Sequence, residues 1–209
     1  MMLLWFLPLF LLFLVIGLPV FFGLLAAPGL LLWLNGQERD IGLLYRNVYN
    51  GIDSFPLMAI PFFMLAGELM NRGGITSRLV EFAQAIMGHL RGGLGQVNVL
   101  SSVMFGGVSG SAAADASAVG GLMVPQMKER GYDVDYAVNI TVVSSIIALM
   151  LPPSHNMIIY SIAAGGRISI ADLFTAGIVP GFLLALTLMI AAWWVAKRKG
   201  YPVQPFQGF

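Results

Sequence analysis

The sequence contains no cysteine, which excludes disulfide bonds, thiolate metal sites and cysteine nucleophiles. Charged residues are also scarce, at 10% of the 209 positions, whereas a soluble domain carries roughly 25%. So few charges cannot cover a surface that faces water. Hydrophobic residues make up 58% of the chain and the mean hydropathy is +0.84. We therefore expect an all-α integral membrane protein that crosses the bilayer several times.

The charges balance to a net +1, and no basic stripe with interleaved aromatic residues is present. Nucleic acid is therefore not an expected partner. The sequence also offers no paired carboxylates or Ser/His/Asp constellation, so we do not expect an enzyme. Apolar runs between the charge clusters meet the bilayer requirement of about 20 residues per helix. They predict a single transmembrane domain over residues 1–199, followed by a short C-terminal tail at 200–209.

The first predicted span, residues 3–34, is apolar throughout but is interrupted at Gly17–Pro19. As one helix it would be about 48 Å long, against a hydrocarbon core of roughly 30 Å. It is therefore either one long, tilted and kinked span or two short helices folded at the interruption. A signal peptide is not expected, because a basic n-region and a small-residue cleavage pattern are both missing. A second span is predicted at 54–70.

Residues 75–91 form an amphipathic pattern rather than a span. Apolar side chains recur there at helical spacing, with polar side chains on the far side. The pattern predicts an interfacial helix, and a packed connector helix is the alternative. The last predicted span is 173–196, and the positive-inside rule places the basic run that follows it, Lys197–Lys199, in the cytoplasm.

The stretch 93–127 carries one central charge, Asp115, just after a Gly/Ser-rich sequence. It is too long for one span and too short for two full spans with a turn. Two half-length helices that meet at a tip fit this length, so we predict a re-entrant helical hairpin entering from the cytoplasmic side. A kinked span with a tightly packed small-residue face is the alternative.

A broken span is predicted at 136–166, where Pro152 and Pro153 interrupt a helical pattern. Two consecutive prolines remove two backbone donors and clash with the preceding turn. The carbonyls near Ala148–Leu151 should therefore lack helical partners. In lipid, such groups are tolerated only where protein or a water-filled cavity satisfies them.

The two breaks supply the hard oxygen ligands that a small cation needs, namely backbone carbonyls with nearby hydroxyl and amide groups. The side chains concerned are those of Ser109, Ser111, Ser154 and Asn156.

Substrate-binding or gating candidates in these two segments are Asp115, Ser144, Ser145 and His155. Asp115 would lie in the first turn of the second half-helix, where the helix dipole favours a carboxylate and where a purely structural cap is the alternative. A proton relay through His155 would need a second buried acid or base, so a neutral hydrogen-bonding role is favoured there.

Three blocks of the sequence resemble the large membrane subunit of tripartite ATP-independent periplasmic (TRAP) transporters, the DctM-like family. The blocks are DSFPLMAIPFFMLAGELM at 53–70, FGGVSGSAAAD at 105–115 and LPPS at 151–154. They occur in order, and the resemblance extends to about Ala196. It identifies the chain as the N-terminal half of such a subunit.

The resemblance implies a multi-pass permease of the bacterial inner membrane that imports an organic anion, such as a dicarboxylate, sialic acid or another sugar acid. Uptake would be coupled to Na⁺, with no further cofactor. A periplasmic substrate-binding protein and a small four-helix membrane subunit would be the partners. Such subunits consist of two inverted repeats and are thought to move as an elevator.

By the same resemblance, Ser109, Gly110 and Ser111 would form a hairpin tip and Pro152–Ser154 the break of the facing helix. Together they would build one Na⁺ site. Two features depart from the family pattern. His155 and Asn156 follow the Pro-Pro-Ser motif where many relatives have an apolar residue, and the second repeat is absent. The alternatives are a subunit of an ion channel with a re-entrant loop or a non-functional truncated half-transporter.

Overall fold

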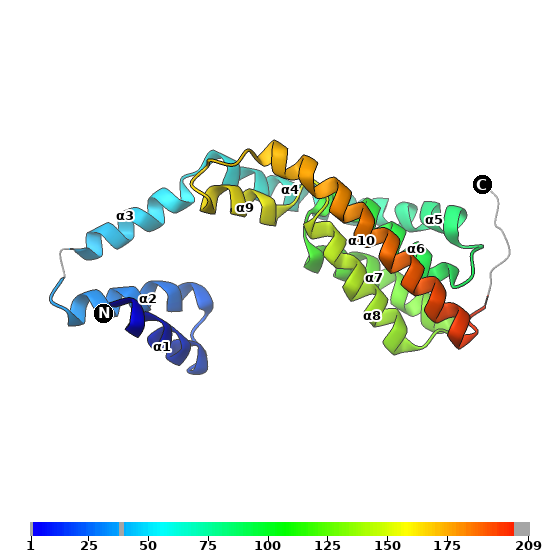
Figure 1. Ribbon diagram of the computed structural model, residues 1–209, viewed down its shortest axis with the longest axis horizontal. Helices are drawn as coiled ribbons and strands as arrows, with labels where there is room; N and C mark the ends of the chain where they lie inside the picture. The colour runs from blue at the N-terminus through cyan, green and yellow to red at the C-terminus, as the bar shows by residue number, and fades with distance from the viewer. Residues whose placement is uncertain (1, 38–39, 203–209) are drawn as a thin grey trace. The chain divides into compact units, whose positions relative to one another are not determined.

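The computed structural model describes residues 2–37 and 40–202, and over these residues the chain is helical, without a strand (Figure 1). The all-α prediction is therefore confirmed for this part of the chain. Its contacts divide it into two compact units, Met1–Phe55 and Pro56–Phe209.

The first unit contains α1 (Met2–Val15), α2 (Val20–Leu34) and α3 (Ile41–Ile52). α1 ends before Gly17, which has a φ of 88°, and α2 begins after Pro19 and packs against α1. Gly23 of α2 lies so close to Phe10 that a Cβ there would be 3.3 Å from the ring. Of the two readings of residues 3–34, the structure therefore has two short helices folded on each other.

Over its residues up to 202, the second unit contains seven α-helices and one short 3₁₀ helix. In chain order they are α4 (Phe55–Arg72), α5 (Ile75–Met87), α6 (Gly93–Ser109), α7 (Ala112–Glu129), α8 (Val134–Ser145), the 3₁₀ helix Ile146–Leu149, α9 (His155–Ala163) and α10 (Ile170–Lys199).

α6 lies at the centre of this unit and packs against α5, α7, α8 and α10. Its apolar side chains Leu94, Val97 and Val99 are completely buried. Close packing against α8 depends on glycine, because a Cβ on Gly95 would collide with the Tyr136 hydroxyl, whereas it would meet the Cβ of Ala192 on α10 at an ordinary contact distance of 3.5 Å. The core is therefore built around the first arm of the predicted hairpin.

α5 buries Thr76, Val80 and Ala83, and it packs against α6. The apolar stripe seen in the sequence lies on another face, where Ile75 and Phe82 are 38% and 46% exposed. The helix ends at Met87 because Gly88 is followed by a turn that leads into Gly92, whose φ is 70°. α5 is thus packed on the core and still presents an apolar stripe outward.

By length and composition, α10 is the one helix in the described ranges that could cross a membrane by itself. α1, α2 and the stretch Val134–Leu149 are apolar but shorter. The outward face of α10 carries exposed Phe182, Leu186 and Ile190. An apolar surface of this kind marks contact with lipid or with another protein.

The C-terminal end of α10 is joined to the loop between α7 and α8. Lys199 forms an ion pair with Asp133, and the Tyr201 hydroxyl donates a hydrogen bond to the same carboxylate at 3.0 Å. The ring of Tyr201 packs against Tyr132 and Tyr136, with centroids 4.4 and 5.2 Å away. These contacts hold the C-terminal end of α10 against the loop between α7 and α8.

The hydrogen bonds from Lys199 and then from Tyr201 lower the pKa of Asp133 below its ordinary value of 3.8. A carboxyl whose pKa is lower in the folded state stabilises the fold above its unfolded pKa, and this contribution is lost as the pH falls through the folded pKa. We expect Asp133→Asn to lower the thermal unfolding midpoint slightly at pH 7. The difference from the parent chain should shrink toward pH 3. A constant difference from pH 7 to pH 3 would contradict this assignment, and circular dichroism in a non-ionic detergent measures it.

Candidate functional site

The tip of the α6–α7 hairpin is formed by Gly110 and Ser111. Gly110 ends α6 with a φ of 59°, a left-handed conformation that glycine adopts without steric cost. Ser111 is the N-cap of α7, and its hydroxyl accepts a hydrogen bond from the amide of Ala114 at 3.4 Å. The sequence thus stops one helix and starts the next within two residues.

The second break lies between the 3₁₀ helix and α9. Residues Met150–Pro153 are irregular, and the Ser154 hydroxyl donates a hydrogen bond to the carbonyl of Leu149 at 2.6 Å. Pro152 and Pro153 have no N–H groups to donate, so the helix cannot continue through them. Ser154 is buried and precedes the first residue of α9.

The structure brings the two breaks into contact. The amide of His155 donates a hydrogen bond to the carbonyl of Gly110 at 3.4 Å. Gly106 lies against the backbone of Ala148, where a Cβ would be only 2.8 Å from the Ala148 Cα. A Cβ on Gly110 would collide with the carbonyl oxygen of Pro153. Only glycine therefore fits at these two positions of the hairpin.

Carbonyl oxygens concentrate at this contact. The carbonyl of Pro153 faces the tip at Gly110, and the carbonyl of Pro152 lies 3.7 Å from where a Cβ of Gly107 would be. Within the described part of the chain, no backbone amide donates to either proline carbonyl. These oxygens are therefore open to another donor or to a cation.

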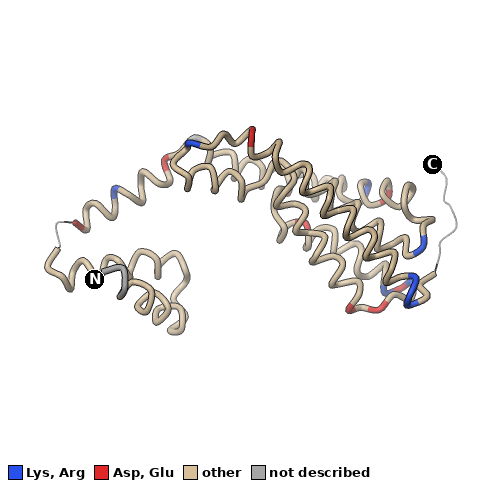
Figure 2. The backbone as a smooth tube through the Cα atoms, in the orientation of Figure 1, with Lys and Arg blue, Asp and Glu red and all other residues tan. Residues whose placement is uncertain are grey.

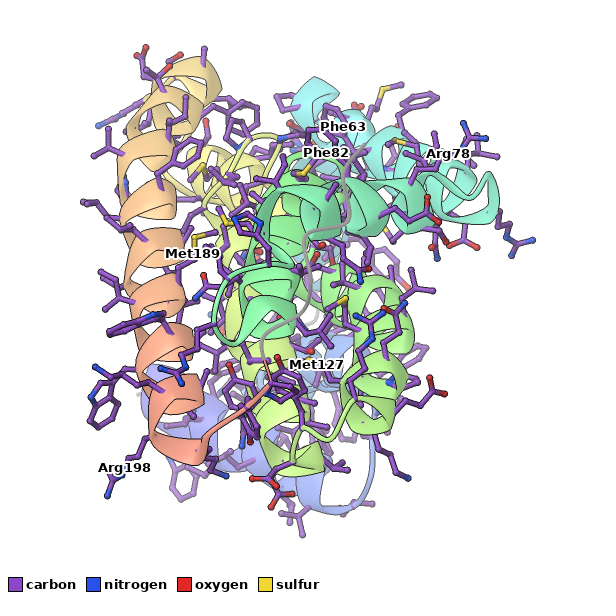
Figure 3. All side chains as sticks on the ribbon, turned by 90° about the vertical axis from the view of Figure 1, so that its right-hand side faces the viewer. Phe63, Arg78, Phe82, Met127, Met189 and Arg198 are labelled. Carbon is purple, nitrogen blue, oxygen red and sulfur yellow. The ribbon has the colours of Figure 1, made fainter. Side chains whose placement is uncertain are left out.

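A cavity of about 420 Å³ adjoins the contact. From the two breaks it is lined by Ser109, Ser111 and His155, and from α4 by Glu68 and Asn71. The remaining lining residues are Phe63, Met64, Leu65, Gly67, Phe105, Ala114, Ser117 and Ala118. Phe63, one of these lining residues, is labelled in Figure 3. The cavity therefore combines apolar walls with a few convergent polar groups, as small-molecule sites do.

Asp115 is completely buried and does not line the cavity. Neither of its carboxylate oxygens has a hydrogen-bond partner, although the Ser102 hydroxyl comes near enough to interact with it. The cap of α7 is made by Ser111 and not by this carboxylate. Asp115 is thus a buried acid within the hairpin, in the first turn of α7.

The other predicted residues lie in different surroundings. Ser144 is buried and accepts or donates a hydrogen bond at 3.0 Å to Ser102, and it donates at 3.2 Å to the amide oxygen of Asn98. Ser145 is buried and donates to the carbonyl of Val142 in its own helix. Asn156 is exposed and does not line the cavity. The roles proposed for these three stay predictions.

A buried polar network between α6 and α8 was not foreseen. The Asn98 amide donates to the Thr141 hydroxyl at 2.6 Å and accepts from Ser144, so three side chains link the two helices. An amide side chain within an apolar segment indicates a hydrogen-bonded contact with another helix, because burying the amide without partners is costly. Glu68 was also missed as a cavity residue, and it pairs with Arg72 at 2.6 Å.

Helices interrupted at facing polar breaks, on an apolar scaffold, are the arrangement from which secondary transporters build their binding sites. The comparison with known sequences agrees with this class. Residues 7–207 match the family described as tripartite ATP-independent periplasmic transporter, DctM component. The chain belongs to this family of membrane transport proteins, which are not enzymes.

Three relatives illustrate the match. The chain is 45% identical over 196 residues to the uncharacterized protein YgiK of Salmonella typhimurium, which covers 93% of this chain and 45% of that protein. It is 43% identical over 190 residues to the 2,3-diketo-L-gulonate TRAP transporter large permease protein YiaN of Escherichia coli. That match covers 90% of this chain and 44% of YiaN. It is also 44% identical over 190 residues to the sialic acid TRAP transporter permease protein SiaT of Haemophilus influenzae. That match covers 91% of this chain and 30% of SiaT. The chain therefore spans less than half the length of these relatives.

The close approach at Gly110 leads to a stability prediction with a matched control. Gly110→Ala adds a methyl group against the Pro153 carbonyl and also strains a left-handed backbone. Gly131→Ala adds the same strain, at a φ of 80°, with nothing within 4 Å of the new methyl group. We expect Gly131→Ala to cost about 1 kcal/mol and Gly110→Ala about 1–3 kcal/mol more. Equal thermal unfolding midpoints in detergent would contradict the contact.

The Asn98 network leads to a second stability prediction. Asn98→Ala removes the amide that joins α6 to α8 and leaves a gap beside Thr141 and Ser144, at an expected cost of about 1–3 kcal/mol. Thr187→Ala is the control, because its hydroxyl bonds only to a carbonyl of its own exposed helix surface. A loss for Asn98→Ala no larger than the control's would show that the network does not stabilise the helix pair. Thermal unfolding measures both.

Proposed function

We propose that this chain is the first half of the large permease subunit of a Na⁺-coupled transporter for an organic anion. The hairpin α6–α7 is re-entrant in this proposal, and the unit forms one repeat of an inverted-repeat, elevator-type carrier in the bacterial inner membrane. The family membership supports transport. The direct contact between the hairpin tip and the broken helix is the observation that carries the rest.

The chemistry of this contact suits a small cation. Na⁺ prefers hard oxygen ligands, and unwound carbonyls at helix breaks coordinate it in transporters. The carbonyls of Pro152 and Pro153 face the tip, and the hydroxyls of Ser109, Ser111 and Ser154 lie at the same two breaks. In this proposal a bound Na⁺ bridges the tip and the broken helix, because both contribute oxygens to it.

The same geometry favours an anionic substrate next to the cation. α7 begins after Ser111 and α9 begins at His155, and both residues line the 420 Å³ cavity. Helix N-termini carry unpaired N–H groups and a partial positive charge, so two of them at one cavity attract a carboxylate. A cation bound beside them strengthens this attraction. The cavity thus supplies one side of an anion site.

The substrate class follows from the relatives and from this charge pattern. The 2,3-diketo-L-gulonate and sialic acid named for the two relatives are both organic acids. We assign an organic carboxylate to this chain as well. The second half of the permease would complete the site, a small membrane subunit would support it, and a periplasmic binding protein would deliver the substrate.

Two serine substitutions test the cation site in a reconstituted complex with the second half and the partners supplied. Ser111→Ala and Ser154→Ala should raise the Na⁺ concentration needed for half-maximal uptake by roughly tenfold, as for loss of about 1.4 kcal/mol of binding. Ser169→Ala is the matched control, since Ser169 caps α10 as Ser111 caps α7. Ser77→Ala on α5 is a surface control.

Radiolabelled substrate uptake into proteoliposomes at graded Na⁺ concentrations reads out this experiment. An unchanged Na⁺ dependence in both site variants would remove the assignment of the cation to the two breaks. Uptake that is equally fast without a Na⁺ gradient would remove the coupling itself. Thermal unfolding of each variant separates loss of the helix cap from loss of cation binding.

A further inference from the structure

The last turns of α10 carry two tryptophan–cation pairs side by side. The Lys197 ammonium lies 5.1 Å from the ring centroid of Trp193, and the Arg198 guanidinium lies 5.7 Å from that of Trp194. Each pair joins residues four apart, which are neighbours on a helix surface. Both indole rings are about half exposed, at 44% and 56%.

The packing of α10 fixes which side chains point outward here. Ala192 and Ala196 are buried, and Gly92 lies so close that a Cβ there would collide with Ala196. This contact holds one face of the helix against the core. The Trp–cation pairs lie on the exposed side, and Figure 3 shows Arg198 directed away from the other helices.

The three basic residues at this end have different roles. Lys199 is paired with Asp133. Lys197 and Arg198 have no acidic partner among the residues that the structure describes. Their charges are therefore available to an external anion. Figure 2 shows these basic residues at the end of α10.

The helix dipole alone accounts for basic residues in a last turn, but it does not require a tryptophan beside each of them. Indole rings with one apolar side and one polar N–H concentrate where hydrocarbon meets headgroups. The outward apolar face of α10 with Leu186 and Ile190 runs directly into the two tryptophans. The cations lie over these rings, where the apolar face ends. Tryptophan rings and basic side chains at the end of an apolar helix lie at the headgroup level of a bilayer.

We propose that Trp193, Trp194, Lys197 and Arg198 form a binding site for the headgroup of an anionic phospholipid in the cytoplasmic leaflet. The lipid phosphate lies between the ammonium and the guanidinium, the indole rings contact the glycerol region, and the acyl chains follow the apolar face of α10. The continuous apolar face favours a lipid over a soluble acidic partner.

The site is tested by titrating the purified, delipidated chain in a non-ionic detergent with short-chain phosphatidylglycerol or phosphatidylcholine. Tryptophan fluorescence reports binding, because both rings belong to the site. We expect tighter binding of phosphatidylglycerol, weakened about fivefold for each charge lost in Lys197→Gln and Arg198→Gln and further in the double variant. Lys199→Gln is the matched control and should leave the affinity nearly unchanged, because the Lys199 ammonium is already paired with Asp133.

Three outcomes overturn the proposal. Equal affinity for the two lipids would show that the anionic charge is not recognised. Displacement of phosphatidylglycerol by an equal concentration of inorganic phosphate would show a simple anion site without lipid specificity. An unchanged affinity in the double variant, with an unchanged thermal unfolding midpoint, would show that these cations do not bind the headgroup.

Discussion

Backbone amide and carbonyl groups inside a bilayer must find partners within the protein, and the rest of this structure is arranged around the two places where helical bonding stops. Gly110 and the pair Pro152–Pro153 each end a helix in an apolar segment. The breaks lie against each other, and the His155 amide donates to the Gly110 carbonyl. The second break thus supplies a backbone amide to a carbonyl at the hairpin tip. The carbonyl of Pro153 in turn faces the tip at Gly110. α6 also packs directly against α8.

Behind this contact, polar side chains hold the helices in register. Asn98, Thr141 and Ser144 connect α6 to α8, and Ser102 adds a further bond. Asp115 lies beside this network, near the Ser102 hydroxyl, but its buried carboxylate oxygens have no hydrogen-bond partner. A charged or protonated acid in such a place is expensive. The hairpin therefore combines a polar layer whose hydrogen bonds are satisfied with a buried carboxylate whose oxygens have no partner.

The chain spans less than half the length of the relatives that it matches, and this bears on how its helix breaks are interpreted. The second unit provides a hairpin tip, a broken helix and two helix N-termini at one cavity. In the function proposed above, this is one side of a binding site. An inverted second half would bring a second set to the same place, because repeats of this kind meet near the middle of the bilayer. At the far end of α10, alanine–glycine packing sets the rotation of the helix. With this rotation Lys197 and Arg198 are exposed without an acidic partner among the described residues, whereas Lys199 is paired with Asp133.

The sequence by itself determined the membrane class, the positions of both helix breaks and the Gly/Ser composition of the tip. Proline and glycine act on the local backbone and need no partner to do so. Hydropathy also predicted apolar runs, but it left residues 3–34 open between one helix and two. Only the tertiary structure showed that α1 and α2 fold on each other, that Gly110 meets Pro153, and that Asn98 and Ser144 share a hydrogen bond. It also placed Asn156, predicted as a ligand, on the exposed side of α9. These facts depend on how helices rotate and pack against partners distant in sequence, which local periodicity does not encode.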